Sequence, residues 1–248
     1  MSIYFKSIFR GLQKQKLTTL INLVGFSIGL TMVMFIAVYL KNELQSDKFH
    51  QNIKNIYRVE SEINTKIYPL TAAPMADWLK LSFSGIEQTA RVFSPFYKGL
   101  NYVEVNHQSF EIKNPVFVDP SFFSIFSFPV LSGRISDNFD TQNAVVITEP
   151  LARKLFDNVN AVGKKIDYSG KNELTVMAVL KKLPANSSMS FELLLPFASF
   201  NDYNSFDLTS WGRSTYQTFV VSNVSSESLT AQINREFKKQ FPDSETKF

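Results

Sequence analysis

The chain has 248 residues, of which 44% are hydrophobic and 19% are charged, enough for one domain of ordinary size or two small ones. It has no cysteine, which excludes disulfides, thiolate metal sites and a cysteine nucleophile, and its two histidines argue against a histidine-rich metal site. Four of the 26 basic residues lie in the first sixteen positions; the other 22 equal the 22 acidic residues, so no nucleic-acid-binding face is expected.

Residues 1–16 are expected to form an amphipathic helix on the cytoplasmic surface of a membrane. Lys6, Arg10 and Lys14 recur every four residues and would form a basic stripe, while apolar residues at helical spacing would form the opposite face. Such a helix suits a membrane surface, where the stripe contacts anionic lipid. A basic tail without regular structure is the alternative.

An uncharged run follows from Leu17 to Leu40, LTTLINLVGFSIGLTMVMFIAVYL. As a helix it rises roughly 36 Å, enough to cross a hydrocarbon core of about 30 Å, so we predict a transmembrane helix over residues 17–42. A signal peptide has an apolar core of only about 7–15 residues and a small-residue cleavage site, which this run lacks. Basic residues precede the run and the charges after it cancel, so the N-terminus is placed in the cytoplasm and residues after about 45 outside.

The stretch GFSIG within this run fits two motifs. As G-x-S-x-G it would make Ser27 the nucleophile of a membrane-anchored hydrolase, but that motif requires a strand, a tight turn and a solvated oxyanion site. A serine in the middle of a membrane helix has none of these, and neither histidine can reach it. As G-x-x-x-G the stretch favours close packing of membrane helices, which makes Gly25 and Gly29 candidate packing residues.

Residues 47–248 contain no second long apolar run and mix strand and helix patterns without regular alternation, which indicates an α+β fold. Extended segments are expected in ARVFSPF and NYVEVNHQSFEI, and a strand, a turn and a helix in VVITEPLARKLF. The other predicted strands are 56–60, 174–184 and 215–223, and the other predicted helices are 74–81, with proline in its first turn, and 227–241.

Several segments in chain order resemble ABC permeases of the MacB/FtsX type. VDPSFFSIFSFPVLSGR, residues 118–134, is similar to the V-D-x-x-F-F-x-x-F-x-F-x-x-L-x-G hallmark of MacB-like periplasmic core domains. VVITEPLARKLF, AVGKKI and VLKKLPANSSMSFELLLP follow in the order and at the spacing of that family. The N-terminal segments FRGLQKQKLTTLINLVGFSIGL and DKFHQNIKNIYRV resemble the first span and its exit, so the resemblance covers nearly the whole chain.

This resemblance implies a bacterial cytoplasmic-membrane protein with a two-lobed periplasmic domain behind its first span. A porter-like βαβ lobe would comprise about residues 50–95 and 175–248, and a smaller lobe would be inserted at about 96–174. Such permeases continue into three more spans after the domain. The chain, which stops at Phe248, is therefore expected to be a fragment of a longer permease.

The implied function is that of a permease subunit coupled to ATP hydrolysis by a separate cytoplasmic ABC ATPase. The membrane helices would pass movement to the periplasmic domain for export or mechanotransmission. The implied partners are that ATPase, the remaining transmembrane segments in a dimer, membrane lipid, and a periplasmic adaptor or an outer-membrane protein. The alternative is a single-span extracytoplasmic sensor or partner-binding module without transport activity.

No residue is predicted to be catalytic, to bind a cofactor or to hold a metal, so we expect the chain not to be an enzyme. AVGKKI lacks the upstream glycine and the Ser or Thr of a P-loop. His50, just past the span, is interpreted as a membrane-interface residue, His107 as structural, and Asp119 as the start of a turn or helix. The phenylalanines at positions 122, 123, 126 and 128 favour core packing over a partner-binding patch.

Overall fold

The computed structural model describes residues 16–44, 46–95, 101–135, 139–141 and 143–248. It divides into two units, residues 1–46 and residues 47–248. The predicted amphipathic helix, with Lys6, Arg10 and Lys14, lies outside the described residues except for its last position. That helix and its basic stripe therefore stay predictions.

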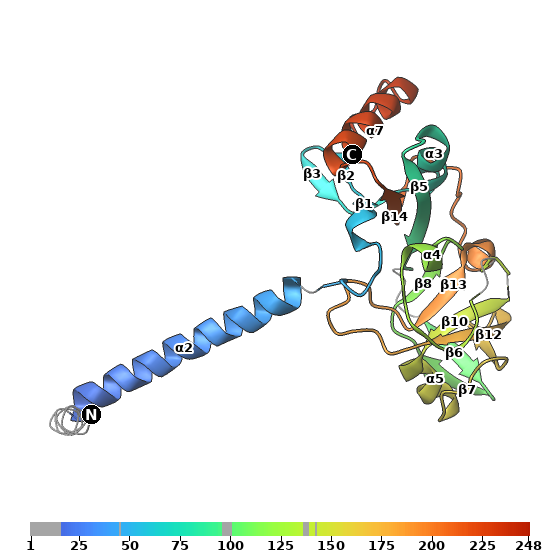
Figure 1. The fold of residues 1–248 in the computed structure, drawn as a ribbon. Helices are drawn as coiled ribbons and strands as arrows, with labels where there is room; N and C mark the ends of the chain where they lie inside the picture. The colour runs from blue at the N-terminus through green and yellow to red at the C-terminus, as the bar shows by residue number, and fades with distance from the viewer. Residues whose placement is uncertain (1–15, 45, 96–100, 136–138, 142) are drawn as a thin grey trace. The chain divides into compact units, whose positions relative to one another are not determined.

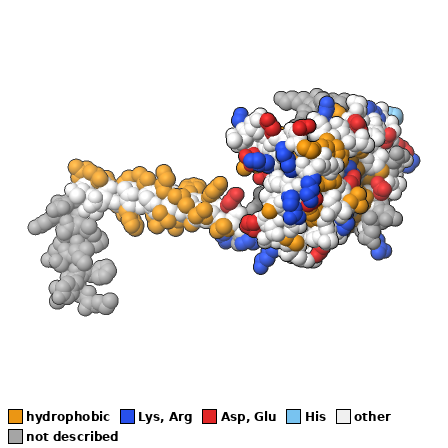
Figure 2. Space-filling model, turned by 90° about the horizontal axis from the view of Figure 1, so that it is seen from above, with side chains coloured by type: hydrophobic (Ala, Val, Ile, Leu, Met, Phe, Trp, Pro, Cys, Tyr) orange, Lys and Arg blue, Asp and Glu red, His pale blue; other side chains and the backbone are white. Residues whose placement is uncertain are grey.

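Helix α2 spans Lys16–Leu44 and includes the whole of the predicted transmembrane helix. The segment Lys16–Lys41 is long and apolar enough to cross a membrane, with a mean hydropathy of 2.3, and none of its apolar window is buried. Exposed apolar side chains surround the helix, as at Leu20, Ile21 and Leu23, and they run along all of α2 in Figure 2. A helix that is apolar on every side, and that no other described residues cover, fits a lipid-facing helix.

Residues 47–248 are built on a twelve-stranded mixed sheet with the order β1-β14-β5-β8-β13-β10-β12-β11-β6-β7; β4 also pairs with β14, and β9 with β12. The pairs β10–β12 and β8–β13 are parallel. A separate hairpin joins β2 (Ser61–Ile63) to β3 (Lys66–Tyr68). The strands of the large sheet are β1 Ile56–Val59, β4 Thr71–Ala72, β5 Ile86–Phe93, β6 Tyr102–Val105, β7 Gln108–Glu111, β8 Pro115–Val118, β9 Val130–Gly133, β10 Ala144–Thr148, β11 Lys165–Tyr168, β12 Asn172–Leu180, β13 Leu193–Pro196 and β14 Ser214–Ser222.

The helices of this unit connect and cover the strands, which confirms the α+β fold class. Their bounds are η1 Ile53–Asn55, α3 Met75–Ser82, α4 Phe122–Ile125, α5 Glu149–Phe156, η2 Phe197–Ser199, α6 Phe200–Tyr203 and α7 Ser226–Gln240. Helix α7 shows why the sequence folds this way locally. Leu229, Ile233 and Phe237 recur every four residues and form its buried face, and the Ser225 hydroxyl accepts a hydrogen bond from the Ser228 amide at the start of the helix.

Both faces of the sheet are buried at its centre. In β10, Val145 and Ile147 belong to one hydrophobic cluster and Ala144 and Val146 to another, as the alternation of a strand requires. This explains why β10 is a continuous apolar run, because a strand buried on both faces has no solvent side.

A third cluster fills the space between α3, α7 and the strands β1, β5 and β14, which lie side by side in Figure 1. Its elements come from the two ends of the predicted porter-like lobe. Strands β12 and β13, which were assigned to the same lobe, pair with β10, β11 and β8 within the one continuous sheet. The lobe boundaries at about 95 and 175 stay a prediction.

Candidate functional sites on the membrane helix and the folded domain

The glycine face of α2 is the predicted helix-packing site. A Cβ atom at Gly25 or Gly29 would meet nothing within 4 Å, so this face is open to a neighbour. On the helix, Ser27 Oγ donates to the Leu23 carbonyl at 2.8 Å, and Thr31 Oγ1 to the Ser27 carbonyl at 2.7 Å. These bonds satisfy both hydroxyls inside a continuous helix, which has no strand or turn to form a nucleophile elbow. The packing role of the two glycines stays a prediction.

His50 anchors the segment that follows α2. Its side chain is only 2% exposed, and its ring centroid lies 5.1 Å from that of Phe126 and 5.0 Å from that of Phe128. The Ser127 amide donates to His50 Nδ1 at 3.0 Å, and the Gln51 amide donates to Ser127 Oγ at 3.3 Å. The interpretation of His50 as a membrane-interface residue is therefore wrong. Phenylalanine rings surround the imidazole, and a backbone amide donates a hydrogen bond to its Nδ1.

A second loop contacts the segment that follows α2, residues 47–51, here called the exit segment. The Asp47 amide donates to the Asn186 carbonyl at 3.3 Å, and the Ser188 amide donates to Asp47 Oδ1 at 2.9 Å. Burial lowers the pKa of His50, and the negative charge of Asp47 partly opposes that shift. The exit segment is thus fixed to the domain by the loop after α4 on one side and by the loop between β12 and β13 on the other.

A largely buried ion pair joins β5 to the loop after β8. Arg91 Nε donates to Asp119 Oδ2 at 2.9 Å and Arg91 Nη2 to Asp119 Oδ1 at 2.8 Å, with the two side chains 14% and 13% exposed. The guanidinium carbon also lies 4.8 Å from the ring centroid of Phe197. The Asp119 carbonyl accepts from the Phe122 amide at 3.0 Å, which confirms the predicted turn. The ion pair itself was not predicted, because no sequence pattern relates two residues 28 positions apart.

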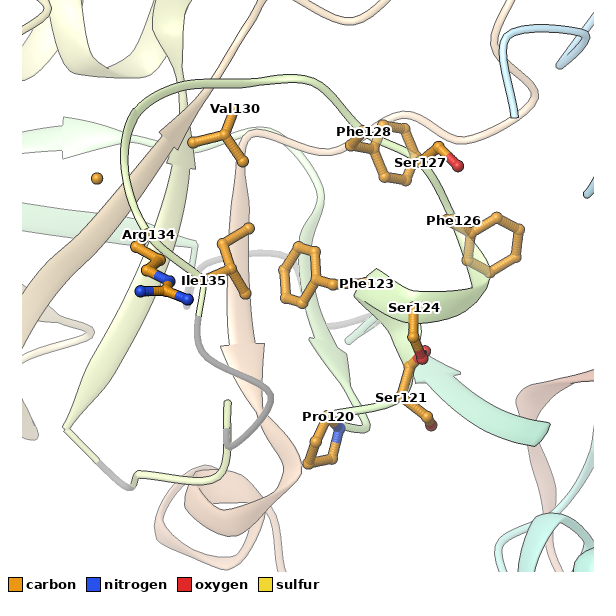
Figure 3. Close-up of a pocket in the computed structure, with 11 residues that line it drawn as sticks. Pro120, Ser121, Phe123, Ser124, Phe126, Ser127, Phe128, Val130, Arg134 and Ile135 are labelled. Carbon is orange, nitrogen blue, oxygen red and sulfur yellow. The ribbon is translucent and has the colours of Figure 1, made fainter. Parts of the chain in front are cut away.

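A pocket of about 630 Å³ opens between the α4 loop and β9. Phe123 and Ile135 point toward each other across it and Val130 borders its upper side (Figure 3). Arg134 lies beside Ile135 at the same wall. The described residues that line it are Pro120, Ser121, Phe123, Ser124, Phe126, Ser127, Phe128, Val130, Gly133, Arg134 and Ile135.

The phenylalanine cluster contributes to both the core and this pocket. Phe122, Phe126 and Phe128 are buried, with the rings of Phe122 and Phe128 stacked at 5.7 Å, so the preference for core packing is confirmed at these positions. Phe123 is only half-buried and packs on Phe139 at 5.2 Å while it lines the pocket. One short segment thus supports the His50 anchor on one side and a cavity on the other.

His107 and the metal-ligating residue types are the remaining candidates. His107 is an exposed residue of the turn between β6 and β7, with a φ of 65°. Among the residues that the structure describes, no group of three or more His, Cys, Asp or Glu side chains could hold a metal ion.

In the chain, a large mixed sheet follows one apolar helix of membrane-spanning length, an arrangement that fits a membrane protein with an extracytoplasmic domain. The chain belongs to the family of MacB-like periplasmic core domains, whose model matches residues 19–240. The resemblance read from the sequence is therefore confirmed. Because the match begins inside α2, the helix and the sheet are parts of one family unit. No curated protein matches the chain.

Solved structures share this fold. A domain assigned to a permease protein of Porphyromonas gingivalis is 21% identical with a TM-score of 0.67, over 80% of this chain and 90% of that chain. The periplasmic region of MacB from Actinobacillus actinomycetemcomitans is 19% identical with a TM-score of 0.57, over 79% and 90%. The extracellular domain of the noncanonic ABC-type transporter YknZ from Gram-positive bacteria is 17% identical with a TM-score of 0.56, over 77% and 98%. At these identities the likeness shows the fold.

Proposed function

We propose that the chain is the N-terminal part of a permease subunit of an ABC transporter. In this proposal a separate cytoplasmic ATPase hydrolyses ATP, and the movement reaches the periplasmic domain for export or mechanotransmission. The observation that carries the proposal is the continuous family match from α2 through the sheet. The similar structures named as a permease protein, MacB and an ABC-type transporter support it.

The contacts of the exit segment support a mechanical role. A helix that crosses a bilayer is a stiff rod, because every backbone hydrogen bond lies within it. Residues 47–51 follow that rod and are fixed to two loops of the domain through Asp47 and His50. A displacement of the exit segment would therefore be passed to the loops that border β8, β12 and β13.

The proposed setting is the bacterial cytoplasmic membrane, with the N-terminus in the cytoplasm and residues after about 45 in the periplasm. The proposed partners are the cytoplasmic ATPase, further transmembrane segments packed on the glycine face in a dimer, membrane lipid, and a periplasmic adaptor or outer-membrane protein. The open surface at Gly25 and Gly29 supports the second of these.

Co-purification tests the proposal. The tagged full-length gene product is purified from its native membrane in a mild detergent, and co-purified proteins are identified by mass spectrometry. We expect a subunit with a P-loop. A control bait, in which α2 is replaced by a polyleucine span of the same length, keeps the domain and should lose that subunit. Repeated capture of the full-length protein without an ATPase would overturn the proposal.

A further inference from the structure

We propose that the pocket between the α4 loop and β9 binds a small organic anion, an apolar body that carries one carboxylate or sulfonate group. The proposal does not depend on the permease function, because it concerns the cavity of the folded domain alone. The volume of the pocket, about 630 Å³, lies within the range of roughly 300–1,000 Å³ that is typical of small-molecule sites.

The walls of the pocket select an apolar body. Phe123 and Ile135 face each other across the cavity, and Val130, which is 40% exposed, borders it from β9 (Figure 3). A ligand between these side chains would remove exposed apolar surface from water at about 25 cal/mol per Å². A flat aromatic ring or a short branched chain fits this arrangement.

The positive charge in the pocket favours a ligand with a negative charge. Among the described residues of the lining, Arg134 is the one that carries a charge, and none of them is Asp or Glu. Within the described part of the chain, Arg134 has no ion-pair partner. A guanidinium beside an apolar wall can bind a carboxylate or sulfonate through two parallel hydrogen bonds.

Two of the three serines among the described lining residues favour one orientation of the ligand. Ser121 Oγ already donates to the Thr89 carbonyl at 2.6 Å, and Ser124 Oγ donates to the Ser121 carbonyl at 2.8 Å. Their protons are used within the fold, so they offer lone pairs and repel an anion. The charged group therefore lies at Arg134, and the apolar body extends toward Phe123.

Equilibrium dialysis with 2-naphthoate as the probe tests this site. The full chain is reconstituted in phosphatidylcholine nanodiscs, and empty nanodiscs correct for partition of the probe into lipid. We expect saturable binding of 2-naphthoate, and binding about tenfold weaker for the neutral 2-naphthamide, because a hydrogen-bonded charge pair is lost. The cationic 2-naphthylmethylammonium should not bind above the empty-disc background.

Two variants and a control locate the site. Arg134→Gln should weaken 2-naphthoate about tenfold and leave 2-naphthamide unchanged, whereas Ile135→Trp should fill the cavity and abolish binding of both. Arg235→Gln, on the exposed face of α7 outside the lining, should bind like wild type. Because Ile135→Trp could also disturb folding, hydrogen exchange on the wild type provides a second measurement, in which 2-naphthoate should slow amide exchange within residues 120–135.

Three results would overturn the proposal. The first is no saturable binding of 2-naphthoate above empty nanodiscs. The second is equal affinity of wild type and Arg134→Gln for 2-naphthoate. The third is protection from exchange that lies outside residues 120–135. None of these results bears on co-purification of an ATPase, so the two proposals fail separately.

Discussion

His50 Nδ1 can accept the hydrogen bond from the Ser127 amide only while the imidazole is neutral, because both nitrogens of a charged imidazole are donors. Burial among phenylalanine rings also disfavours the charge, so the pKa of His50 is lowered from its ordinary value of 6.5. The folded protein therefore binds this proton less readily than the unfolded chain does. Acid should loosen the attachment of residues 47–51 to the domain.

The unfolding free energy is expected to fall on acidification from pH 8 to pH 5. The contribution of His50 to this fall begins near pH 6.5, where the imidazole of the unfolded chain takes up its proton. It levels off below the pKa that His50 has in the folded protein. The slope due to this one group cannot exceed about 1.4 kcal/mol per pH unit. The domain can be followed by the fluorescence of its two tryptophans, which pack on each other at 6.1 Å.

The variant His50→Asn keeps an acceptor but does not titrate, so it should remove most of this pH dependence. The matched control is His107→Asn, since that residue is exposed in a turn at a φ that Asn tolerates. An unchanged pH profile in His50→Asn would contradict the role assigned to His50.

Arg91 and Asp119 form the other contact that depends on individual side chains. We expect Arg91→Met and Asp119→Asn each to lower the unfolding free energy by about 3 kcal/mol. The first leaves Asp119 without its cation, and the second leaves Arg91 with only the longer contact, 3.6 Å, to the exposed Asp77. The double variant should lose clearly less than the sum of the two. Lys165→Met, which breaks the exposed pair with Glu173, should cost under about 1 kcal/mol in the same denaturant titration. Additive losses at Arg91 and Asp119 would exclude a direct pair.

At the scale of single elements, sequence patterns were most informative where burial is periodic. The apolar spacing of Leu229, Ile233 and Phe237 predicted α7, and the uncharged run from Leu17 to Leu40 predicted α2. The strand predicted over 174–184 is β12, which begins earlier, at Asn172, and ends earlier, at Leu180, four residues before Pro184.

Helix α2 yields a prediction about its own surface. Gly25→Leu or Gly29→Leu should leave tryptophan-detected unfolding of the domain unchanged, because a Cβ atom there meets no described residue within 4 Å. The same changes should reduce co-purification of the ATPase and the other permease segments severalfold, because close helix approach requires small residues.

Ser27→Leu is the matched control, as it places the same leucine side chain about 200° around the helix from Gly25, on the opposite face. Equal loss of partners in all three variants would mean that bulk anywhere on α2 is disruptive. In that case the glycine face would have no specific role.

For the whole molecule, the membrane topology can be tested directly because the natural sequence has no cysteine. A single Lys66→Cys, at an exposed position of β3, should react with a membrane-impermeant maleimide added to spheroplasts. A single Ser2→Cys should react only after the membrane is opened, as the positive-inside rule requires. The reverse labelling pattern would contradict the proposed orientation.

The family and the α+β class could be read from the sequence, but the contacts that build the candidate sites could not. The pair Arg91–Asp119 and the bond from Ser127 to His50 join residues 28 and 77 positions apart. The periodicity of apolar residues along a helix or strand indicates which of its faces is buried. It does not indicate which distant loop covers that face. The pocket could not be predicted for the same reason. Phe123, which lines it, is one of four similar phenylalanines in the sequence, and only the fold leaves this one half-exposed.

The place of β14 in the sheet has a consequence for how the protein is made. Strand Ser214–Ser222 lies between β1 and β5 and pairs with both. Strands β1 and β5 belong to the first hundred residues, and the strand that joins them in the sheet is missing until residue 222 has been synthesised. Contacts over such sequence distances form slowly, and unpaired strand edges aggregate. A domain exported as it is synthesised would therefore cross the membrane incomplete. Until its last strand arrives, the edges of β1 and β5 that pair with β14 would stay open to aggregation.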